Sequence, residues 1–284
     1  MPRAPVLDPS QYEPDEDGLT RAIVGPWVRE KHVRLEKNVG ISRAARKKYL
    51  GPGKAGATFI DVFCGPGRAR IQETNDIVHG SPLVAWLESQ RGKAPFSSVH
   101  VADANAELCH AAEARLRKAG APVHAEIGAA SETVGIIVGK LNPEGLHFAF
   151  LDPFNLEALP FDVIRTLASV KRMDLLVHVS LQDLNRNLRK YVTQEESPLD
   201  AFAPKWRESV DINRSDRLVR AKIWEHWRGL VKNLGMRTTE TAEQVVGSRN
   251  QPLYLLAFAA RHELPLEFWE KIRHLEPPRQ TSLL

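Results

Sequence analysis

Short apolar runs alternate with amphipathic stretches from residue 57 to residue 180. Each run is short and rich in β-branched or aromatic residues, which predicts strands at 57–63, 99–103, 122–127, 146–152 and 174–180. Apolar positions at helical spacing predict the intervening helices at 82–90, 104–120, 131–141 and 159–170. Strands that alternate with helices in this way predict a doubly wound α/β fold, a parallel sheet with helices on both faces.

Different patterns flank this alternation. Residues 1–19 are rich in Pro and Asp and are expected to form a mobile acidic arm. From Thr20 to Leu35, and again over 42–50, the spacing predicts two helices, so that 20–54 would be a basic helical extension. Residues 55–284 would then form a Rossmann-like domain with a helical insertion at about 183–240 and two closing strands, at 243–248 and 252–262.

Charge is distributed unevenly along the chain, whose net charge is +4. Residues 1–19 carry five acids and one base, whereas residues 20–54 carry ten bases and two acids. A concentrated basic segment is typical of a protein that binds a polyanion, and the expected nucleic-acid contacts are Arg43, Arg46, Lys47 and Lys48. A solvated helix face explains the same run equally well.

Composition excludes several classes of protein. No apolar run reaches the roughly 18 residues that a membrane-spanning helix needs, and the N-terminus has no apolar stretch that would make a secretory signal. The two cysteines, Cys64 and Cys109, can form neither a disulfide framework nor a zinc quartet, and the ten histidines show no metal spacing. We therefore expect a soluble, cytoplasmic protein without a metal and without a membrane partner.

A glycine-rich turn follows the first predicted strand. Its pattern is D-x-F-x-G-x-G, from Asp61 through Phe63 and Gly65 to Gly67, and glycines there let the backbone turn sharply and approach a ligand closely. The triphosphate pattern G-x-x-x-x-G-K-[ST] is absent, and Arg70 stands where a dinucleotide site has its third glycine. The pattern resembles motif I of S-adenosylmethionine-dependent methyltransferases, which implies S-adenosyl-L-methionine as the cofactor. The alternative is a tight strand-to-helix turn without a ligand.

Two further acids end predicted strands. Asp103 could offer its carboxylate to the two ribose hydroxyls of a nucleoside, or it could cap the helix that follows. The run Asp152-Pro153-Phe154 resembles the [DNS]-P-P-[YF] motif of methyltransferases that act on amines, in which the polar side chain accepts the amine's hydrogens and the aromatic ring stacks on the base. It departs from that motif because the second proline is missing and Asn155 occupies the aromatic position. A plain turn is the alternative interpretation.

The residues after the fourth strand carry weaker signals. His178 lies inside an apolar run and is expected to be a core histidine. Five polar residues follow that run and would lie at the carboxyl edge of the sheet, where ligands bind: Gln182, Asp183, Asn185, Arg186 and Asn187.

The order of these motifs resembles the three-Cys-motif partner proteins. The resemblance rests on Trp27 with Glu30-Lys31-His32, the glycine-rich turn, the 80–83 turn, the run that begins at Asp152, residues 174–187 and the closing strand near 252–272. It implies a Rossmann-like methyltransferase fold and association with a three-Cys-motif, radical-type protein. This chain has no cysteine motif of its own.

The motifs together lead to one principal hypothesis and two alternatives. In the principal hypothesis the protein is an S-adenosylmethionine-dependent methyltransferase that acts on nucleic acid. The expected cofactor-binding residues are Asp61, Phe63, Gly65, Gly67 and Asp103, and the expected catalytic residues are Asp152, Pro153 and Phe154. The second hypothesis is a non-catalytic nucleic-acid-binding or complex-forming protein that retains the fold. The third is a hydrolase that holds a metal between Asp61, Asp103 and Asp152.

Overall fold

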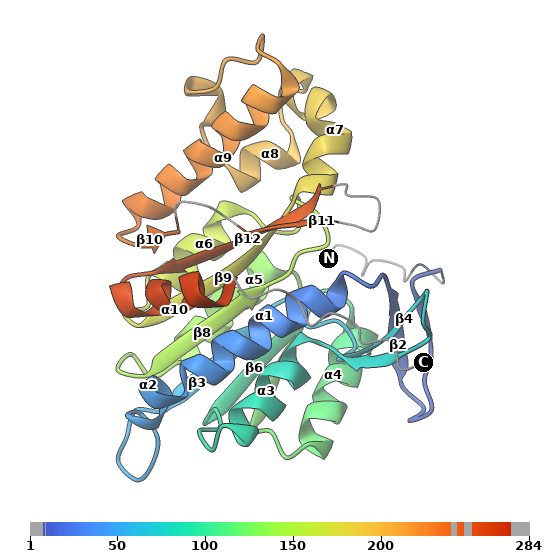
Figure 1. Cartoon of the computed structure of the whole chain (residues 1–284), viewed down its shortest axis with the longest axis vertical. Helices are drawn as coiled ribbons and strands as arrows, with labels where there is room; N and C mark the ends of the chain where they lie inside the picture. The colour runs from blue at the N-terminus through green and yellow to red at the C-terminus, as the bar shows by residue number, and fades with distance from the viewer. Residues whose placement is uncertain (1–7, 9, 240–242, 247–251, 274–284) are drawn as a thin grey trace.

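A mostly parallel sheet forms the centre of the computed structural model, which describes residues 8, 10–239, 243–246 and 252–273 (Figure 1). Its strand order is β10-β12-β9-β8-β3-β6-β7, and β11 also pairs with β12. The parallel strands are β3 (Ala57–Asp61), β6 (Ser98–Asp103), β7 (Val123–Ile127), β8 (Leu146–Leu151) and β9 (Met173–Ser180). The antiparallel strands are β10 (Arg237–Thr238), β11 (Glu243–Val246) and β12 (Pro252–Ala260).

Helices cover both faces of this sheet, as the sequence pattern predicts. One face packs against α1 (Val28–Ile41), α3 (Ser81–Arg91), α4 (Ala106–Lys118) and α10 (Glu263–Arg273). The other face packs against α5 (Ala130–Lys140) and α6 (Phe161–Ala168). Side chains alternate along each strand, so that Phe59 faces the first set of helices and Ile60 the second. The doubly wound α/β class is therefore confirmed.

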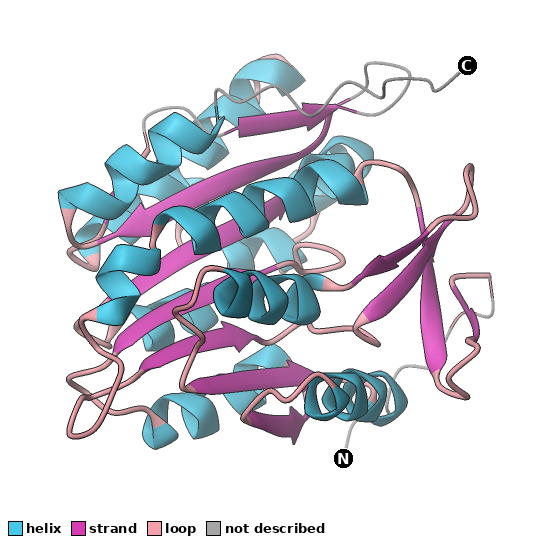
Figure 2. Cartoon of the chain, turned by 60° about the horizontal axis from the view of Figure 1, so that its bottom comes forward, coloured by secondary structure: helices cyan, strands magenta, loops and turns pink. Residues whose placement is uncertain are grey.

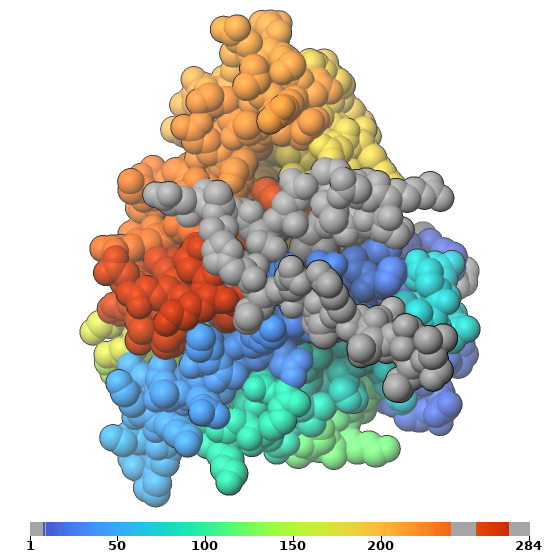
Figure 3. All heavy atoms as spheres, viewed as in Figure 1, coloured from blue at the N-terminus to red at the C-terminus, as the bar shows by residue number. Residues whose placement is uncertain are grey.

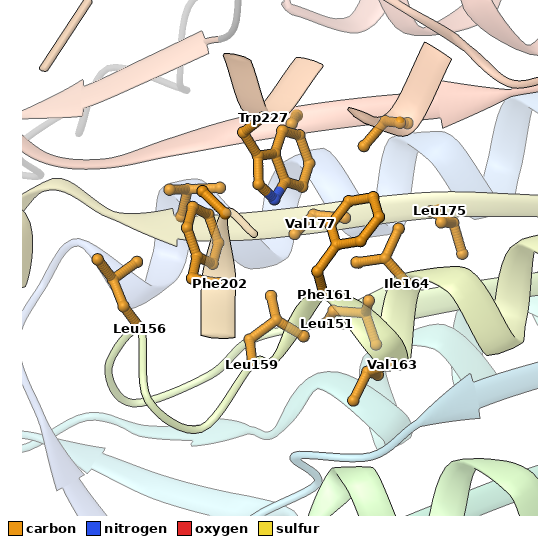
Figure 4. Close-up of a cluster of buried hydrophobic side chains, with 14 of the residues drawn as sticks. Leu151, Leu156, Leu159, Phe161, Val163, Ile164, Leu175, Val177, Phe202 and Trp227 are labelled. Carbon is orange, nitrogen blue, oxygen red and sulfur yellow. The ribbon is translucent and has the colours of Figure 1, made fainter. Parts of the chain in front are cut away.

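The helical insertion lies between β9 and β10. It consists of α7 (Leu181–Thr193), α8 (Pro198–Phe202), a short 3-10 helix (Trp206–Glu208) and α9 (Asp216–Asn233). Aromatic side chains join it to the core: Phe202 and Trp227 stack with ring centroids 5.7 Å apart, and Figure 4 shows both rings directed toward the loop that carries Leu156 and Leu159. The insertion therefore supports the loop that follows β8. Among the described residues no helix is both long and apolar enough to cross a lipid bilayer.

A second, four-stranded sheet lies beyond the carboxyl ends of the central strands (Figure 2) and is absent from the sequence-based prediction. Its strands are β1 (Tyr12–Pro14), β2 (Thr20–Val24), β4 (Arg68–Ile71) and β5 (Ile77–His79). The helix predicted from Thr20 is therefore wrong over its first residues. Pairing of β2 with β4 overrides the local helical pattern, and α1 begins only at Val28, after Pro26.

The acidic segment is folded over the described residues 10–19 and is not a mobile arm. Glu13 forms ion pairs with Arg21 and Arg70. Asp15, whose side chain is 0% exposed, faces three guanidinium groups: Arg21 at 2.8 Å, Arg68 at 3.2 Å and Arg115 at 3.1 Å. The composition of the segment alone suggested disorder because the opposing charges lie elsewhere in the sequence.

Arg115 of α4 is the centre of this charged cluster. Its guanidinium also contacts Asp17 at 2.7 Å and donates to the carbonyl oxygens of Thr20 and Pro66, at 2.8 and 2.6 Å. Pro66 belongs to the glycine-rich turn. One buried side chain therefore joins the N-terminal sheet, helix α4 and the turn after β3.

We predict that Arg115→Met destabilises the protein by about 3–5 kcal/mol, because the buried carboxylate of Asp15 loses one of its three guanidinium partners and the carbonyl oxygens of Thr20 and Pro66 lose their donor. Arg117→Met is the matched control on the same helix: Arg117 is exposed and, among the described residues, pairs only with Glu113, so its loss should change the free energy of unfolding by no more than about 0.5 kcal/mol. Urea unfolding of both variants measures the difference. Equal effects at the two positions would contradict the central role of Arg115.

Candidate active site

The candidate site lies at the carboxyl end of β3, where the strand order reverses. From β3 the chain proceeds to β6 and β7 on one side and then returns to β8 and β9 on the other. Such a switch point leaves a crevice outside the strand ends, because the connections on its two sides diverge. The Gly-rich turn after Asp61, Asp103 at the end of β6 and Asp152 just after β8 are brought to this edge together.

The two glycines of the turn have different surroundings. Gly65 has φ of +52°, and a Cβ added there would meet nothing within 4 Å. Gly67 also has positive φ, +75°, but a Cβ added there would come within 3.2 Å of the Cα atom of Ala112. Gly65 therefore borders open space that a ligand can occupy. Gly67 is buried and packs closely against α4, and its role as a ligand contact stays a prediction.

Asp61 is buried beneath the turn and does not face the crevice. Its carboxylate accepts hydrogen bonds from the backbone N–H of Phe63, at 3.1 Å, and from the Ser81 hydroxyl, at 2.6 Å. Burial raises the pKa of Asp61 to about 7. The prediction that Asp61 binds the cofactor is thus corrected to a structural role: it joins the end of β3 to the start of α3. The half-buried Phe63 ring packs against the core.

Asp103 faces the turn from the neighbouring strand. Its Oδ2 accepts from the N–H of Gly65 at 3.0 Å, and its Oδ1 accepts from the N–H of Asn105 at 2.8 Å. The side chain of Asn105, not Asp103, caps helix α4 by accepting from the N–H groups of Glu107 and Leu108. An ionised carboxylate has about four acceptor positions, so Asp103 can take two further hydrogen bonds. Burial raises its pKa.

A charged cluster forms on the other side of the switch point. Asp152 contacts His178 Nδ1 through Oδ1 and Lys31 Nζ through Oδ2. Burial of Asp152 would raise its pKa, but the charge of Lys31 and the contact with His178 outweigh burial and lower it. The rings of His178 and Tyr254 of β12 meet in an edge-to-face contact, with ring centroids 4.3 Å apart. The cluster thus joins α1, β8, β9 and β12.

This geometry bears on the prediction for the run Asp152-Pro153-Phe154. In the amine motif the polar side chain must accept hydrogens from the substrate, and each carboxylate oxygen of Asp152 already has one partner in the protein, so a substrate amine would have to share these oxygens. The Phe154 side chain is 79% exposed rather than lining the wall of a pocket, and Pro153 is buried. Asn155 accepts from the N–H of Ala158 at 2.9 Å and forms a turn.

Two residues of the cluster were missed or misjudged from the sequence. His178 was expected to be a satisfied core histidine, whereas it contacts a carboxylate at the edge of the sheet. Lys31 lies 121 positions before Asp152, and helical periodicity gives no signal that it reaches β8. Asp183, in contrast, lies at the predicted edge. Its carboxylate accepts from the N–H of Leu156 at 2.8 Å, which anchors the loop after β8 to α7.

The basic segment lies elsewhere on the molecule. Helix α2 (Arg43–Lys47) follows the 14-residue helix α1, so it is about 20 Å from the site end of α1. In Figure 3 the light-blue atoms of this part of the chain lie at the lower left of the molecule. Arg46 is buried and donates to the carbonyl oxygens of Ala94 and Val39, at 3.0 and 2.6 Å. Its assignment as a nucleic-acid contact is therefore wrong. Arg43, Lys47 and Lys48 are exposed.

Neither thiol chemistry nor a metal site is apparent at this edge. Cys64 is buried within the turn, and burial raises the pKa of its thiol, which disfavours the nucleophilic thiolate. Among the described residues, no group of three or more His, Cys, Asp or Glu side chains is arranged to hold a metal ion. Asp61, Asp103 and Asp152 each have their own hydrogen-bond partners and do not converge.

The sequence matches no family model and no curated protein. Several solved structures are similar in fold. One is an O-methyltransferase from Bacillus cereus in complex with SAH, with a TM-score of 0.46, 12% identity, and coverage of 84% of this chain and 82% of that one. Another is the O-methyltransferase TomG from Streptomyces achromogenes in complex with SAM, with a TM-score of 0.44, 15% identity, and coverage of 80% and 79%. A third is protein LPL1258 from Legionella pneumophila, with a TM-score of 0.48, 8% identity, and coverage of 84% and 89%.

The raised pKa of Asp61 predicts a pH dependence of stability. Because its folded-state pKa, about 7, exceeds the ordinary value of 3.8, the folded state favours the protonated carboxyl, and its contribution to stability falls as pH rises from 4 to 7. Asp61→Asn cannot ionise; its amide oxygen can still accept from the N–H of Phe63, and its amide NH2 group can donate to the Ser81 hydroxyl oxygen. The variant should reduce the loss of unfolding free energy between pH 5 and pH 7 by about 1–3 kcal/mol, measured by urea unfolding. The exposed Asp162→Asn is the control, and identical profiles for wild type and Asp61→Asn would contradict the prediction.

Proposed function

We propose that the protein is an S-adenosylmethionine-dependent methyltransferase. The observation that carries this proposal is the pairing of an open glycine turn at the end of β3 with a carboxylate at the end of β6. Gly65 leaves space beside its backbone, and Asp103 lies within hydrogen-bond distance of its N–H. A nucleoside needs both features: a backbone that it can approach closely and an acceptor for its ribose hydroxyls.

Each residue of the turn would have a defined task. Asp103 would accept from the ribose hydroxyls of S-adenosylmethionine, and the backbone at Gly65 would border the cofactor. Asp61 and Arg115 would hold the turn from beneath and from the side. The cofactor supplies an activated methyl group on a sulfonium sulfur, and the protein's contribution is to align the acceptor and exclude water.

The cluster across the switch point supports an enzyme over a scaffold that retains the fold. Lys31 and Asp152 are largely withdrawn from water, with side chains 11% and 17% exposed, and burial of charge costs free energy even when the charges pair. The pKa of Asp152 is lowered, and a carboxylate with a shifted pKa at the carboxyl edge of such a sheet is characteristic of catalytic sites. A scaffold has no need of such an arrangement at this position.

Gly65→Ala tests the cofactor site. The added Cβ would enter the space beside the turn, and we expect the Kd for S-adenosylmethionine or S-adenosylhomocysteine to rise at least tenfold. Any alanine at positive φ also costs about 1–2 kcal/mol of stability. Gly120→Ala controls for this strain, since Gly120 has φ of +76° and open surroundings at the end of α4.

Calorimetric titration of the two variants and the wild type measures the effect. Unchanged affinity in Gly65→Ala would remove the turn from the binding site. Absence of binding by the wild type at millimolar concentrations of both compounds would contradict the proposed function itself.

The acceptor that we propose is nucleic acid. The support is the exposed cationic surface of Arg43, Lys47 and Lys48, which lies about 20 Å along α1 from Lys31. A nucleic acid that reached both places would have to extend across α1, a span of about six base pairs of duplex. A three-Cys-motif, radical-type protein stays the partner predicted from the sequence resemblance.

Salt dependence tests the nucleic-acid proposal. Each phosphate that a protein neutralises adds about 0.9 to the slope of log affinity against log salt for duplex DNA. The triple reversal Arg43→Glu, Lys47→Glu and Lys48→Glu should therefore flatten the slope by up to about 2.7. The control reverses three exposed cations elsewhere, Arg117, Lys118 and Lys140, with the same change in net charge. Equal slopes for the two triple variants would contradict this surface.

A further inference from the structure

We propose that His178 is the general base of the reaction and that the group methylated is a hydroxyl, with Asp152 and Lys31 positioning the imidazole. This inference rests on the proposed methyltransferase function and goes beyond it by naming the chemical class of the acceptor. It starts from the contacts of a single side chain, His178, at the carboxyl end of β9.

The geometry determines which ring nitrogen carries the proton. Nδ1 of His178 faces Oδ1 of Asp152, and a carboxylate with a lowered pKa is an acceptor only, so Nδ1 must donate. In a neutral imidazole the other nitrogen, Nε2, then has a free lone pair. Tyr254 packs against the ring at a centroid distance of 4.3 Å and fixes its plane. This is the arrangement of a base oriented by a carboxylate.

The charges around His178 favour its neutral form. Burial lowers the pKa of His178, the nearby Asp152 opposes that effect, and the positive charge of Lys31 acts in the same direction as burial. Lys31 Nζ also lies 5.9 Å from the centre of the Tyr254 ring. Lys31 therefore compensates Asp152, so that the carboxylate can orient the imidazole without converting it into an imidazolium at neutral pH.

The chemistry of the acceptor follows from this. An amine attacks a methyl group with its own lone pair and can release its proton afterwards, whereas a neutral hydroxyl is a weak nucleophile until its proton is removed. In the proposed step the acceptor O–H bond breaks and its proton passes to Nε2. The oxygen electron pair forms the new bond to the methyl carbon, and the carbon–sulfur bond breaks with its electrons left on sulfur. The products are a methyl ether, S-adenosylhomocysteine and a protonated His178.

In the alternative, an amine held by Asp152, the substrate would have to share the carboxylate with the protein. His178 and Lys31 each occupy one acceptor position, one on each oxygen of Asp152. The side chain of Asn155, the next polar group along the loop, accepts from Ala158. The hydroxyl acceptor is favoured because Asp152 orients His178 as a base, which a hydroxyl needs and an amine does not.

The tautomer of His178 tests the proposal without a substrate. In protein labelled with ¹⁵N-histidine, NMR at pH 7.5 should show His178 neutral with its proton on Nδ1. His147 is an internal control that should show the opposite tautomer. Its Nε2 lies 2.9 Å from the carbonyl oxygen of Asn142, so Nε2 must carry the proton. Asp152→Asn should abolish the Nδ1–H preference of His178 and leave His147 unchanged. A His178 imidazolium, or an Nε2–H tautomer in the wild type, would overturn the proposal.

Methyl transfer from labelled S-adenosylmethionine to total RNA gives a second readout, because RNA presents ribose hydroxyls and exocyclic amines together. Nucleoside analysis should find O-methylation, and His178→Gln should lower kcat at least a hundredfold with unchanged cofactor Kd. His147→Gln should retain activity. N-methylated products, or full activity in His178→Gln, would overturn this inference while the proposed function stands. Failure of the wild type to bind the cofactor would instead remove the proposed function. If RNA receives no methyl group, the tautomer of His178 measured by NMR still supports or contradicts the proposed role of His178.

Discussion

Charge buried at the carboxyl edge of the central sheet must be compensated, and the parts of the molecule around the crevice meet this requirement. Helices cover both faces of the sheet, so the strand ends are where polar side chains gather, partly out of water. Arg115 compensates Asp15 and Asp17 on one side of the crevice, and Lys31 compensates Asp152 on the other. Both pairs join segments far apart in sequence. The same contacts that neutralise charge therefore fix the position of the N-terminal sheet, of α1 and of the glycine-rich turn.

The central sheet was predictable from the sequence because its determinants are local. The strand predicted at 146–152 is apolar from 148 to 151, since parallel strands are buried on both faces, and a helix signal such as Pro82 lies in the first turn of the helix that it begins. The chain order of the strands also placed Asp61, Asp103 and Asp152 at one edge. What the pattern could not show was which of them faces the crevice. Asp61 turns under the loop to Ser81, a partner 20 residues away.

The features that escaped prediction depend on distant partners. The N-terminal strands pair with residues that follow the glycine-rich turn, so the local pattern at Thr20 was a poor guide. Arg46 was counted as a surface cation, yet carbonyl oxygens from two other segments surround its guanidinium, and Phe96 lies beneath it with a ring centre 4.7 Å away. The roles that we infer for Lys31 and His178 depend on their contacts with Asp152. Contacts between residues far apart in the sequence leave no periodic pattern, so they cannot be detected from hydrophobic periodicity.

The pairing of the N-terminal strands also has a consequence for the order of folding. The contact between Asp15 and Arg115 spans 100 residues, and β2 must pair with β4 across nearly 50. Contacts of such long range are slow to form, because the intervening chain must be ordered first. During synthesis the N-terminal acids emerge well before α4, and their carboxylates stay solvated by water until the guanidinium partners are in place. The glycine-rich turn, held through Pro66 by Arg115, would then reach its final shape among the last parts of the molecule, after the sheet that carries it.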